Sequence, residues 1–143
     1  MAALNPTSAL RAARNAASIK LADTGAGASS IKLYTAPGDT LLAVRVLARP
    51  CGSVDAAGRI QLAQAATDDL VLADGGASYG EWCDADGAPI ASGHVTDAAG
   101  NYTDADGAVV PHPDGVGPFV VSGTAGTRLY AGGVLRLATA LIG

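Results

Sequence analysis

The sequence predicts a mainly β protein, an antiparallel β-sandwich or jelly roll with one short N-terminal helix. Short runs of alternating apolar and polar residues recur along the chain, and turn sequences separate them at intervals of roughly 8 to 12 residues. The 19 glycines among 143 residues favour turns and strands over a helical bundle. A chain of this length forms one domain around a single core, so we expect residues 1–143 to fold as one β-sandwich.

The stretch from Gly75 to Val95 contains the clearest hairpin. Its first half alternates as far as Trp82, and Asp84-Ala85-Asp86-Gly87 then reverses the chain. Aspartate side chains accept hydrogen bonds from their own turn, and glycine adopts the positive φ that the turn requires. The only tryptophan of the chain can bury about 150–250 Å². Trp82 is therefore expected to anchor the core.

A helix is predicted over residues 8–22, because Thr7 or Ser8 can cap its first turn and no helix breaker follows. Apolar residues recur at helical spacing along it, at Leu10, Ala13, Ala17 and Leu21, while Arg11, Asn15 and Ser18 lie away from this stripe. The apolar stripe is expected to pack, either as a lid over the open end of the domain's own sandwich or as an arm on a neighbouring subunit.

Further strands are predicted before and after the hairpin. Residues 31–35 and 41–47 come first, and Arg49-Pro50-Cys51-Gly52 is expected to end the second of them. Residues 59–62 alternate polar and apolar in the manner of a half-exposed strand. Further short runs of this kind lie at 70–72, 119–121, 127–130 and 134–137. The sequence therefore predicts about eight to ten short strands after the helix.

One turn sequence, D-A-[AD]-G, occurs four times, starting at Asp55, Asp84, Asp97 and Asp104. The intervals between these starts are unequal, which indicates a turn that is used repeatedly and not a structural repeat. Two of the four turns fall within residues 97–117, together with two prolines. This segment is predicted to be an irregular loop or a small hairpin.

Composition limits the classes of function. The net charge is −4 and the pI about 4.8, whereas nucleic-acid binding needs clustered Lys and Arg. No apolar run approaches the roughly 18 residues of a membrane span, and we expect neither a membrane segment nor a secretory signal. Charged residues are only 15% of the chain, against about 25% in an ordinary domain. Either neighbouring proteins cover part of the surface, or an alanine-rich coding bias dilutes the charge.

The pentapeptide Gly76-Ala77-Ser78-Tyr79-Gly80 matches the G-x-S-x-G pattern of serine hydrolases. In such enzymes the serine occupies a strained turn between a strand and a helix, and an acid and a histidine complete the site. Asp86 with His94 or His112 could supply these groups. However, a strand and a turn follow the motif instead of a helix, and the chain is short for the required parallel sheet. We therefore do not expect an enzyme.

Two sets of residues contain the side-chain types that bind metals. Cys51, Cys83, His94 and His112 could bind zinc, but none of them are paired at the spacing of structural zinc sites. Calcium could bind where Asp97, Asp104, Asp106 and Asp114 converge, but neither D-A-D-G turn has the distal ligands of a calcium loop. No catalytic, cofactor-binding or metal-binding residue is expected.

The two cysteines lie 32 positions apart, and one pair in a chain of this size is not a disulfide framework. Cys51 and Cys83 could form a bridge or remain free. Without a secretory signal the free form is favoured, and both are then expected to behave as small buried apolar residues.

The order of segments resembles a family of small structural proteins from tailed bacteriophages. The resemblance rests on an N-terminal helix with ALRAARNAA (9–17), a strand with IKLYT (31–35), a TLLAxxxL strand (40–47), a Gly-Ala…Trp strand (76–82) and a D-x-x-G turn leading to G-x-V (93–95). It covers roughly residues 7–95. The chain is similar in size, strand number and low charge to jelly-roll cement proteins, which decorate the capsids of short-tailed phages.

This resemblance implies a structural protein of the virion, made in the cytoplasm of a bacterial host and bound to the exterior of the capsid. A cement protein binds across capsomer junctions and stabilises the head. Its partners would be the major capsid protein and further copies of itself, as a dimer or trimer. Interfaces are expected at the N-terminal helix and at the C-terminal run from Leu137 to Gly143. The segment 97–117 departs from the shorter relatives.

Three other functions stay open. A neck, tail or fibre-attachment component of the virion could use the same fold. A small serine esterase would act through Ser78. A secreted glycan-binding β-sandwich would need exposed aromatic rings, and the four tyrosines are too dispersed in the sequence to indicate a stacking platform; they are Tyr34, Tyr79, Tyr102 and Tyr130.

Overall fold

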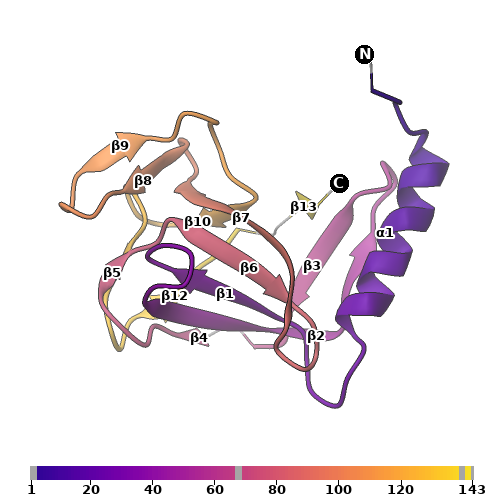
Figure 1. The fold of residues 1–143 in the computed structure, drawn as a ribbon, viewed down its shortest axis with the longest axis horizontal. Helices are drawn as coiled ribbons and strands as arrows, with labels where there is room; N and C mark the ends of the chain where they lie inside the picture. The colour runs from indigo at the N-terminus through magenta and orange to yellow at the C-terminus, as the bar shows by residue number, and fades with distance from the viewer. Residues whose placement is uncertain (1–2, 67–68, 139–140, 143) are drawn as a thin grey trace.

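A curled β-sheet forms the body of the protein, and one helix packs at its side (Figure 1). The computed structural model describes residues 3–66, 69–138 and 141–142. The main sheet has seven strands, named here in the order in which neighbours pair: β10 (Phe119–Val121), β7 (Pro89–Asp97), β6 (Tyr79–Cys83), β1 (Ser30–Tyr34), β2 (Leu41–Val54), β3 (Ile60–Gln64) and β13 (Leu141–Ile142).

Three two-stranded ribbons extend this sheet. They are β11 (Arg128–Leu129) with β5 (Gly75–Gly76), β12 (Val134–Leu135) with β4 (Asp69–Leu70), and β8 (Asn101–Thr103) with β9 (Val109–Pro111). With helix α1 (Ser8–Ala22), they complete the mainly β fold that the sequence predicts, so the predicted fold class is confirmed. One strand pair departs from the antiparallel expectation, because β10 runs parallel to β7.

The sheet curls back on itself, because its edge strand β10 is connected to β2 through β12 and β4. A bridge between Ala43 and Val71 places the strand around β4 beside β2. β12 pairs with β4, and a second bridge joins Val121 of β10 to Leu137, two residues beyond β12. The alternating residues of each strand therefore point into one shared interior. The large side chains there are almost fully buried and include Leu33, Leu42, Leu47, Ile60, Val95, Phe119 and Leu135.

Trp82 anchors this core as predicted, with 3% of its surface exposed. Its indole N–H donates a hydrogen bond of 2.9 Å to the hydroxyl of Ser29, and that hydroxyl donates one of 2.6 Å to the carbonyl of Cys83. A buried indole N–H needs such a partner. The bonds join the loop before β1 to the strand that carries the tryptophan.

The predicted end of β2 at Arg49-Pro50-Cys51-Gly52 is wrong, because the strand continues to Val54. Its register with β3 shifts between Leu47 and Gly52, so Pro50 lies in an irregular stretch. The loop after the helix provides partners there. The side chain of Arg49 donates to the carbonyls of Gly25 and Gly27, and the amide of Cys51 donates to the carboxylate of Asp23.

Helix α1 has the predicted bounds, but the face expected to pack is wrong. Leu10 and Leu21 are 52% and 55% exposed, and Ala22 is the buried residue of the helix. The helix packs on β2 and β3 through the opposite side. There the side chains of Arg11 and Asn15 donate hydrogen bonds of 2.9 and 2.6 Å to the carbonyls of Ala57 and Gly58. The polar side of the helix faces the domain because the carbonyl oxygens of this turn accept hydrogen bonds from its side chains.

The four D-A-[AD]-G turns share one geometry. In each, the carboxylate of the first Asp accepts hydrogen bonds from the backbone N–H groups two and four positions later, at 2.9 to 3.0 Å. The glycine of each turn has a φ between +82° and +85°, which only glycine adopts without strain. The same short sequence therefore makes the same turn in four places. Within residues 97–117 it leads into and then closes the β8–β9 hairpin, which protrudes from the sheet (Figure 1).

Candidate functional site

Ser78, the serine of the G-x-S-x-G pattern, lies between β5 and β6. Gly80 belongs to strand β6, so the motif does not form the strand-to-helix elbow of serine hydrolases. The Ser78 hydroxyl donates a hydrogen bond of 2.5 Å to the carbonyl of Thr35. Neither His94 nor His112 bonds to this hydroxyl in the described part of the chain. The serine thus fastens the start of β6 to the β1–β2 turn.

His94 and His112 lie together, although 18 positions separate them. Their rings stack with centroids 3.8 Å apart and 8° between the planes. With Asp114 they form a group whose potential metal ligands lie within 4.8 Å of one another. Nitrogen lone pairs lie in the ring planes, and those planes are parallel, so the two imidazoles do not aim at a common point. The spacing of these residues in the sequence does not indicate the cluster, because the fold and not the local spacing creates it.

The stacked histidines fasten the segment after β9 to strand β7. The Nε2 atom of His94 is 3.2 Å from the carbonyl oxygen of Gly115, and the Nδ1 atom of His112 accepts a hydrogen bond from the amide of Asp114. The amide of Gly117 donates to the Thr96 hydroxyl nearby. This cluster has an evident structural role.

The other predicted metal ligands lie apart. Among the described residues, the four acids Asp97, Asp104, Asp106 and Asp114 do not form a metal-ligating group with one another. Cys51 and Cys83 are free and buried, as the sequence predicts. Burial and then the negative charge of Asp23, which also hydrogen-bonds to the thiol, raise the pKa of Cys51 to about 11. Burial likewise raises the pKa of Cys83.

Two of the four tyrosines are closer than the sequence suggested. Tyr34 and Tyr79 are paired across β1 and β6, and their ring centroids lie 6.0 Å apart. Tyr102 and Tyr130 lie elsewhere, on β8 and after β11 respectively. The expectation of four dispersed rings is therefore wrong for the first pair, which is created by strand register.

Several large apolar side chains that point outward from the sheet lie on or next to the β4–β12 ribbon. Leu70 and Leu72 are each 59% exposed, while Val71 between them is buried. Val134 pairs directly with Leu70 across β4 and β12 and is 43% exposed, and Tyr130 is 63% exposed. We call the outward surface of Leu70, Leu72, Tyr130 and Val134 the β4–β12 face. It is an apolar surface that lies outside the core.

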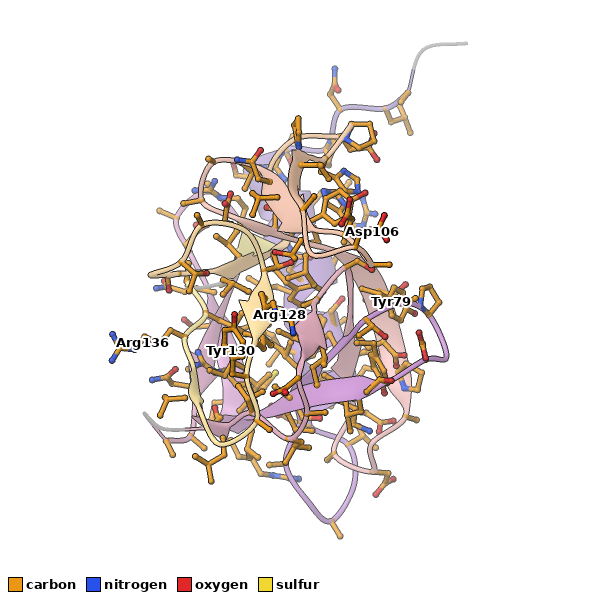
Figure 2. The ribbon with its side chains drawn as sticks, turned by 90° about the vertical axis from the view of Figure 1, so that its left-hand side faces the viewer. Tyr79, Asp106, Arg128, Tyr130 and Arg136 are labelled. Carbon is orange, nitrogen blue, oxygen red and sulfur yellow. The ribbon has the colours of Figure 1, made fainter. Side chains whose placement is uncertain are left out.

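Two arginines border the β4–β12 face. Arg128 places its guanidinium carbon 5.3 Å from the ring centroid of Tyr130, a distance at which cation and ring attract each other. A hollow of about 250 Å³ is lined by Arg128, Arg136, Tyr130 and Val134. Figure 2 shows the three labelled residues of this group on one side of the molecule. Neither arginine forms an ion pair within the described residues, where the two ion pairs are Arg45–Asp69 and Arg59–Asp55.

The run Leu70-Val71-Leu72 is predicted as a strand from the sequence, but its exposed face is not. An alternating run has the same sequence pattern whether its leucines or its valine point inward. The structure decides this, because Val71 bridges to Ala43 and faces the interior with it.

The helix has a second exposed apolar surface. Its stripe of Leu10, Ala13, Ala17 and Leu21 points away from the sheet, and all four residues are exposed. In Figure 1 the helix and the β4–β12 ribbon lie toward opposite ends of the longest axis. The two apolar surfaces therefore could contact two different neighbours at once.

The chain matches no protein-family model, no curated protein and no solved structure. Within the described residues, no helix is long and apolar enough to cross a membrane.

Proposed function

We propose that this protein is a structural component of a bacteriophage virion, a cement protein that binds the capsid through its β4–β12 face. The exposed apolar surface of Leu70, Leu72, Tyr130 and Val134 carries this proposal. The resemblance of the segment order to phage cement proteins supports it.

The composition of the β4–β12 face is that of a protein interface. Aromatic residues and arginine are enriched in interfaces, where a buried apolar centre is bordered by polar groups. Here Leu70, Leu72 and Val134 form an apolar centre, and Tyr130 with Arg128 and Arg136 borders it. Exposed large apolar side chains cluster on a soluble protein chiefly where a partner covers them.

The scaffold behind this face suits a protein that resists mechanical load. The curled sheet closes on itself, so β4 and β12 each have neighbouring strands. Buried Arg45 links the two strands. Its Nε donates a hydrogen bond of 3.0 Å to the Asp69 carboxylate, and its Nη2 donates one of 2.9 Å to the carbonyl of Leu135. In the described part of the chain, every buried side-chain polar atom has a hydrogen-bond partner.

The outward stripe of α1 provides a contact between copies. A protein that binds a shell on one surface and another copy on a second surface gains strength from many weak contacts. Leu10 and Leu21 would form that contact, in keeping with a dimer or trimer. In this arrangement the major capsid protein covers the β4–β12 face and a second copy covers the helix.

The first test is co-sedimentation with capsids from the phage that encodes this chain, assembled without it. The wild-type chain should bind, and cryo-electron microscopy should show added density at positions repeated over the icosahedral shell. Leu72→Asp places a charge in the β4–β12 face and should lower binding at least about tenfold, the effect of burying one unpaired charge. The matched control is Val116→Asp, since Val116 is also exposed, at 56%, and lies outside both apolar surfaces.

Three outcomes would overturn the proposal. Absence of binding would reopen the enzyme and glycan-binding functions. Density restricted to one vertex or to the tail would assign the protein to the neck or fibre attachment. Equal binding by Leu72→Asp and the wild type would exclude the β4–β12 face as the contact.

The contact between copies is tested separately by sedimentation equilibrium. The double variant Leu10→Glu with Leu21→Glu should shift the wild-type oligomer to a monomer, whereas Leu72→Asp should leave it unchanged. The helix would be excluded as an interface if the wild-type chain were monomeric at all concentrations in solution and if its copies did not contact one another on the capsid.

A further inference from the structure

A cleft of about 490 Å³, with both apolar and polar lining, lies between the turn after β1 and the β8–β9 hairpin. Its lining comes from segments far apart in the sequence and includes Asp39, Thr40, Tyr102, Asp104 and Arg128. Small-molecule sites of proteins typically have volumes of about 300–1,000 Å³ and a few well-placed polar groups. The cleft therefore has room for one or two sugar rings.

We propose that this cleft binds a neutral sugar. The proposal is independent of the capsid function, because none of the four residues of the β4–β12 face lines the cleft; Arg128, which borders that face, also lines the cleft.

Asp104 supplies a fixed hydrogen-bond acceptor. Its Oδ1 atom accepts hydrogen bonds of 3.0 and 2.9 Å from the amides of Asp106 and Ala108, and these hold the carboxylate in place. Its Oδ2 atom has no hydrogen bond within the described residues. A carboxylate with one oxygen held and the other available can accept from the hydroxyl groups of a sugar without first ordering itself, which lowers the entropy lost on binding.

Tyr102 supplies a ring on which the C–H face of a sugar can pack. His112 contacts this ring edge-on, with centroids 5.6 Å apart and 63° between the planes, and so supports it from one side. The ring is partly exposed and lines the cleft. A sugar site needs an exposed aromatic ring, and Tyr102 provides one. The positions of the four tyrosines in the sequence do not indicate this.

Arg128 is the one basic residue among the described residues that line the cleft. It pairs with Gly76 across β11 and β5, and Gly76 also lines the cleft. A Cβ atom at Gly76 would lie 2.4 Å from the carbonyl oxygen of Thr103, so only glycine lets β5 approach β8 this closely. Through that close approach, Arg128 and Asp104 line the same cleft although they lie far apart in the sequence.

The charges select the class of ligand. Asp39 and Asp104 carry two negative charges and Arg128 one positive charge, and none of the three forms an ion pair within the described residues. The cleft is thus net negative and repels sugars that carry a carboxylate or sulfate. A neutral hexose offers hydroxyl groups that donate to the acids and accept from the arginine. A free hexose and the terminal hexose of a glycan chain present the same groups.

The test is a titration followed by two-dimensional ¹H–¹⁵N NMR of the purified chain. The probes are the methyl glycosides of glucose, galactose and mannose, then maltotriose as a chain with terminal glucose, and glucuronic acid as the anionic control. A neutral probe should shift the amide signals of residues 39–40, 75–76 and 102–106, and glucuronic acid should not. Binding by maltotriose alone would assign the site to glycan chains, and binding by a monosaccharide would include free sugars.

The chain contains its own control, because D-A-D-G occurs at both Asp84 and Asp104 with the same turn geometry. Asp104→Asn retains an oxygen for the two turn amides but loses the free carboxylate oxygen, and should weaken binding at least tenfold. Asp84→Asn makes the same change away from the cleft and should bind as the wild type does. Tyr102→Ala should also abolish binding, while Tyr102→Phe should retain it.

Three results would overturn the proposal. One is the absence of specific shifts with every neutral probe at tens of millimolar. Another is equal binding by Asp104→Asn and Asp84→Asn. The third is tighter binding of glucuronic acid than of glucose. Loss of sugar binding leaves the capsid assay of Leu72→Asp unaffected, so failure of one proposal is distinguishable from failure of the other.

Discussion

The carboxylate of Asp97 accepts a hydrogen bond of 2.7 Å from the backbone N–H of Gly126, which lies 29 positions further along the chain. Its other oxygen accepts bonds from the amides of Ala99 and Asn101 in its own turn. Asp97 is 3% exposed. Asp55, Asp84 and Asp104 form the same turn, and within the described residues their carboxylates bond only to groups within four positions. One of the four repeated turns therefore also fixes tertiary structure.

Asp97→Ala should destabilise the protein more than the equivalent change in an exposed turn. It leaves the buried amide of Gly126 without its partner, and such a loss costs about 1–3 kcal/mol in addition to the turn bonds. We expect the free energy of unfolding in urea to fall by about 2–4 kcal/mol. Asp84→Ala should lower it by about 1 kcal/mol, since water replaces the lost bonds there. Equal losses would contradict a tertiary role for Asp97.

The same carboxylate should make stability depend on pH. Burial alone would raise the pKa of Asp97, but the hydrogen bonds from the amides of Asn101, Gly126 and Ala99 outweigh it and leave the pKa below its ordinary value. The folded state therefore holds the charged form more strongly than the unfolded state does. This contribution is complete above the ordinary aspartate pKa of about 4 and is lost as the pH falls through the lower folded value.

Denaturation of the wild type and of Asp97→Asn between pH 7 and pH 2 measures this contribution. The wild type should exceed the variant in stability at neutral pH, and the difference should shrink below about pH 4. A difference that stays constant over this range would show that the Asp97 charge does not contribute.

The buried chain of bonds at Trp82 gives a third prediction. Trp82→Phe retains an aromatic ring but removes the donor to Ser29, and Ser29→Ala removes the acceptor and the bond to the Cys83 carbonyl. Each change should lower the free energy of unfolding by about 1–3 kcal/mol. The double variant should lose less than the sum, because the indole–hydroxyl bond is counted in both single variants. A strictly additive double variant would mean that the bond contributes nothing.

Local signals predicted much of this fold. The bounds of helix α1 follow from the side chain of Thr7, which accepts from the amide of Leu10 as an N-cap, and from the absence of a breaker before Asp23. The D-A-[AD]-G turns can be predicted from the sequence because the hydrogen bonds that define each turn lie within five residues. Trp82 was predictable as a core residue because a chain poor in aromatic residues has no other side chain of its size.

The errors all concern partners distant in sequence. The packing face of α1 depends on the carbonyls of Ala57 and Gly58, which no local pattern at Arg11 or Asn15 reveals. Strand β2 passes Pro50 because the loop carbonyls of Gly25 and Gly27 bind Arg49. The stacking of His94 on His112 and the cleft at Tyr102 likewise depend on where the β8–β9 hairpin folds back. Periodicity reports the local conformation of a strand or helix, but not what covers it.

The reversed face of the helix can be tested by paired substitutions. Leu21→Ser should change the free energy of unfolding by less than about 0.5 kcal/mol, because the side chain is exposed. Ile19→Ser should lower it by about 2 kcal/mol, since Ile19 packs against the core. Asn15→Ala should lower it by about 1 kcal/mol through the bond to Gly58. Thermal or urea denaturation distinguishes the two faces, and a larger effect at Leu21 than at Ile19 would restore the original orientation.

The two cysteines should be almost unreactive in the folded protein. Both thiols are buried, so a reagent cannot reach them in the folded protein. The pKa of Cys51 is also raised to about 11, which leaves about one thiol in a thousand ionised at pH 8, against about a quarter for an ordinary cysteine. With an aromatic disulfide reagent at pH 8, native protein should release colour only at the slow rate of unfolding, and both thiols should react at once in guanidinium chloride. Cys51→Ser should remove one of the two equivalents released on unfolding. Rapid release of either equivalent from native protein would show that the loop at Asp23, which covers Cys51, or the strand that holds Cys83 opens in solution.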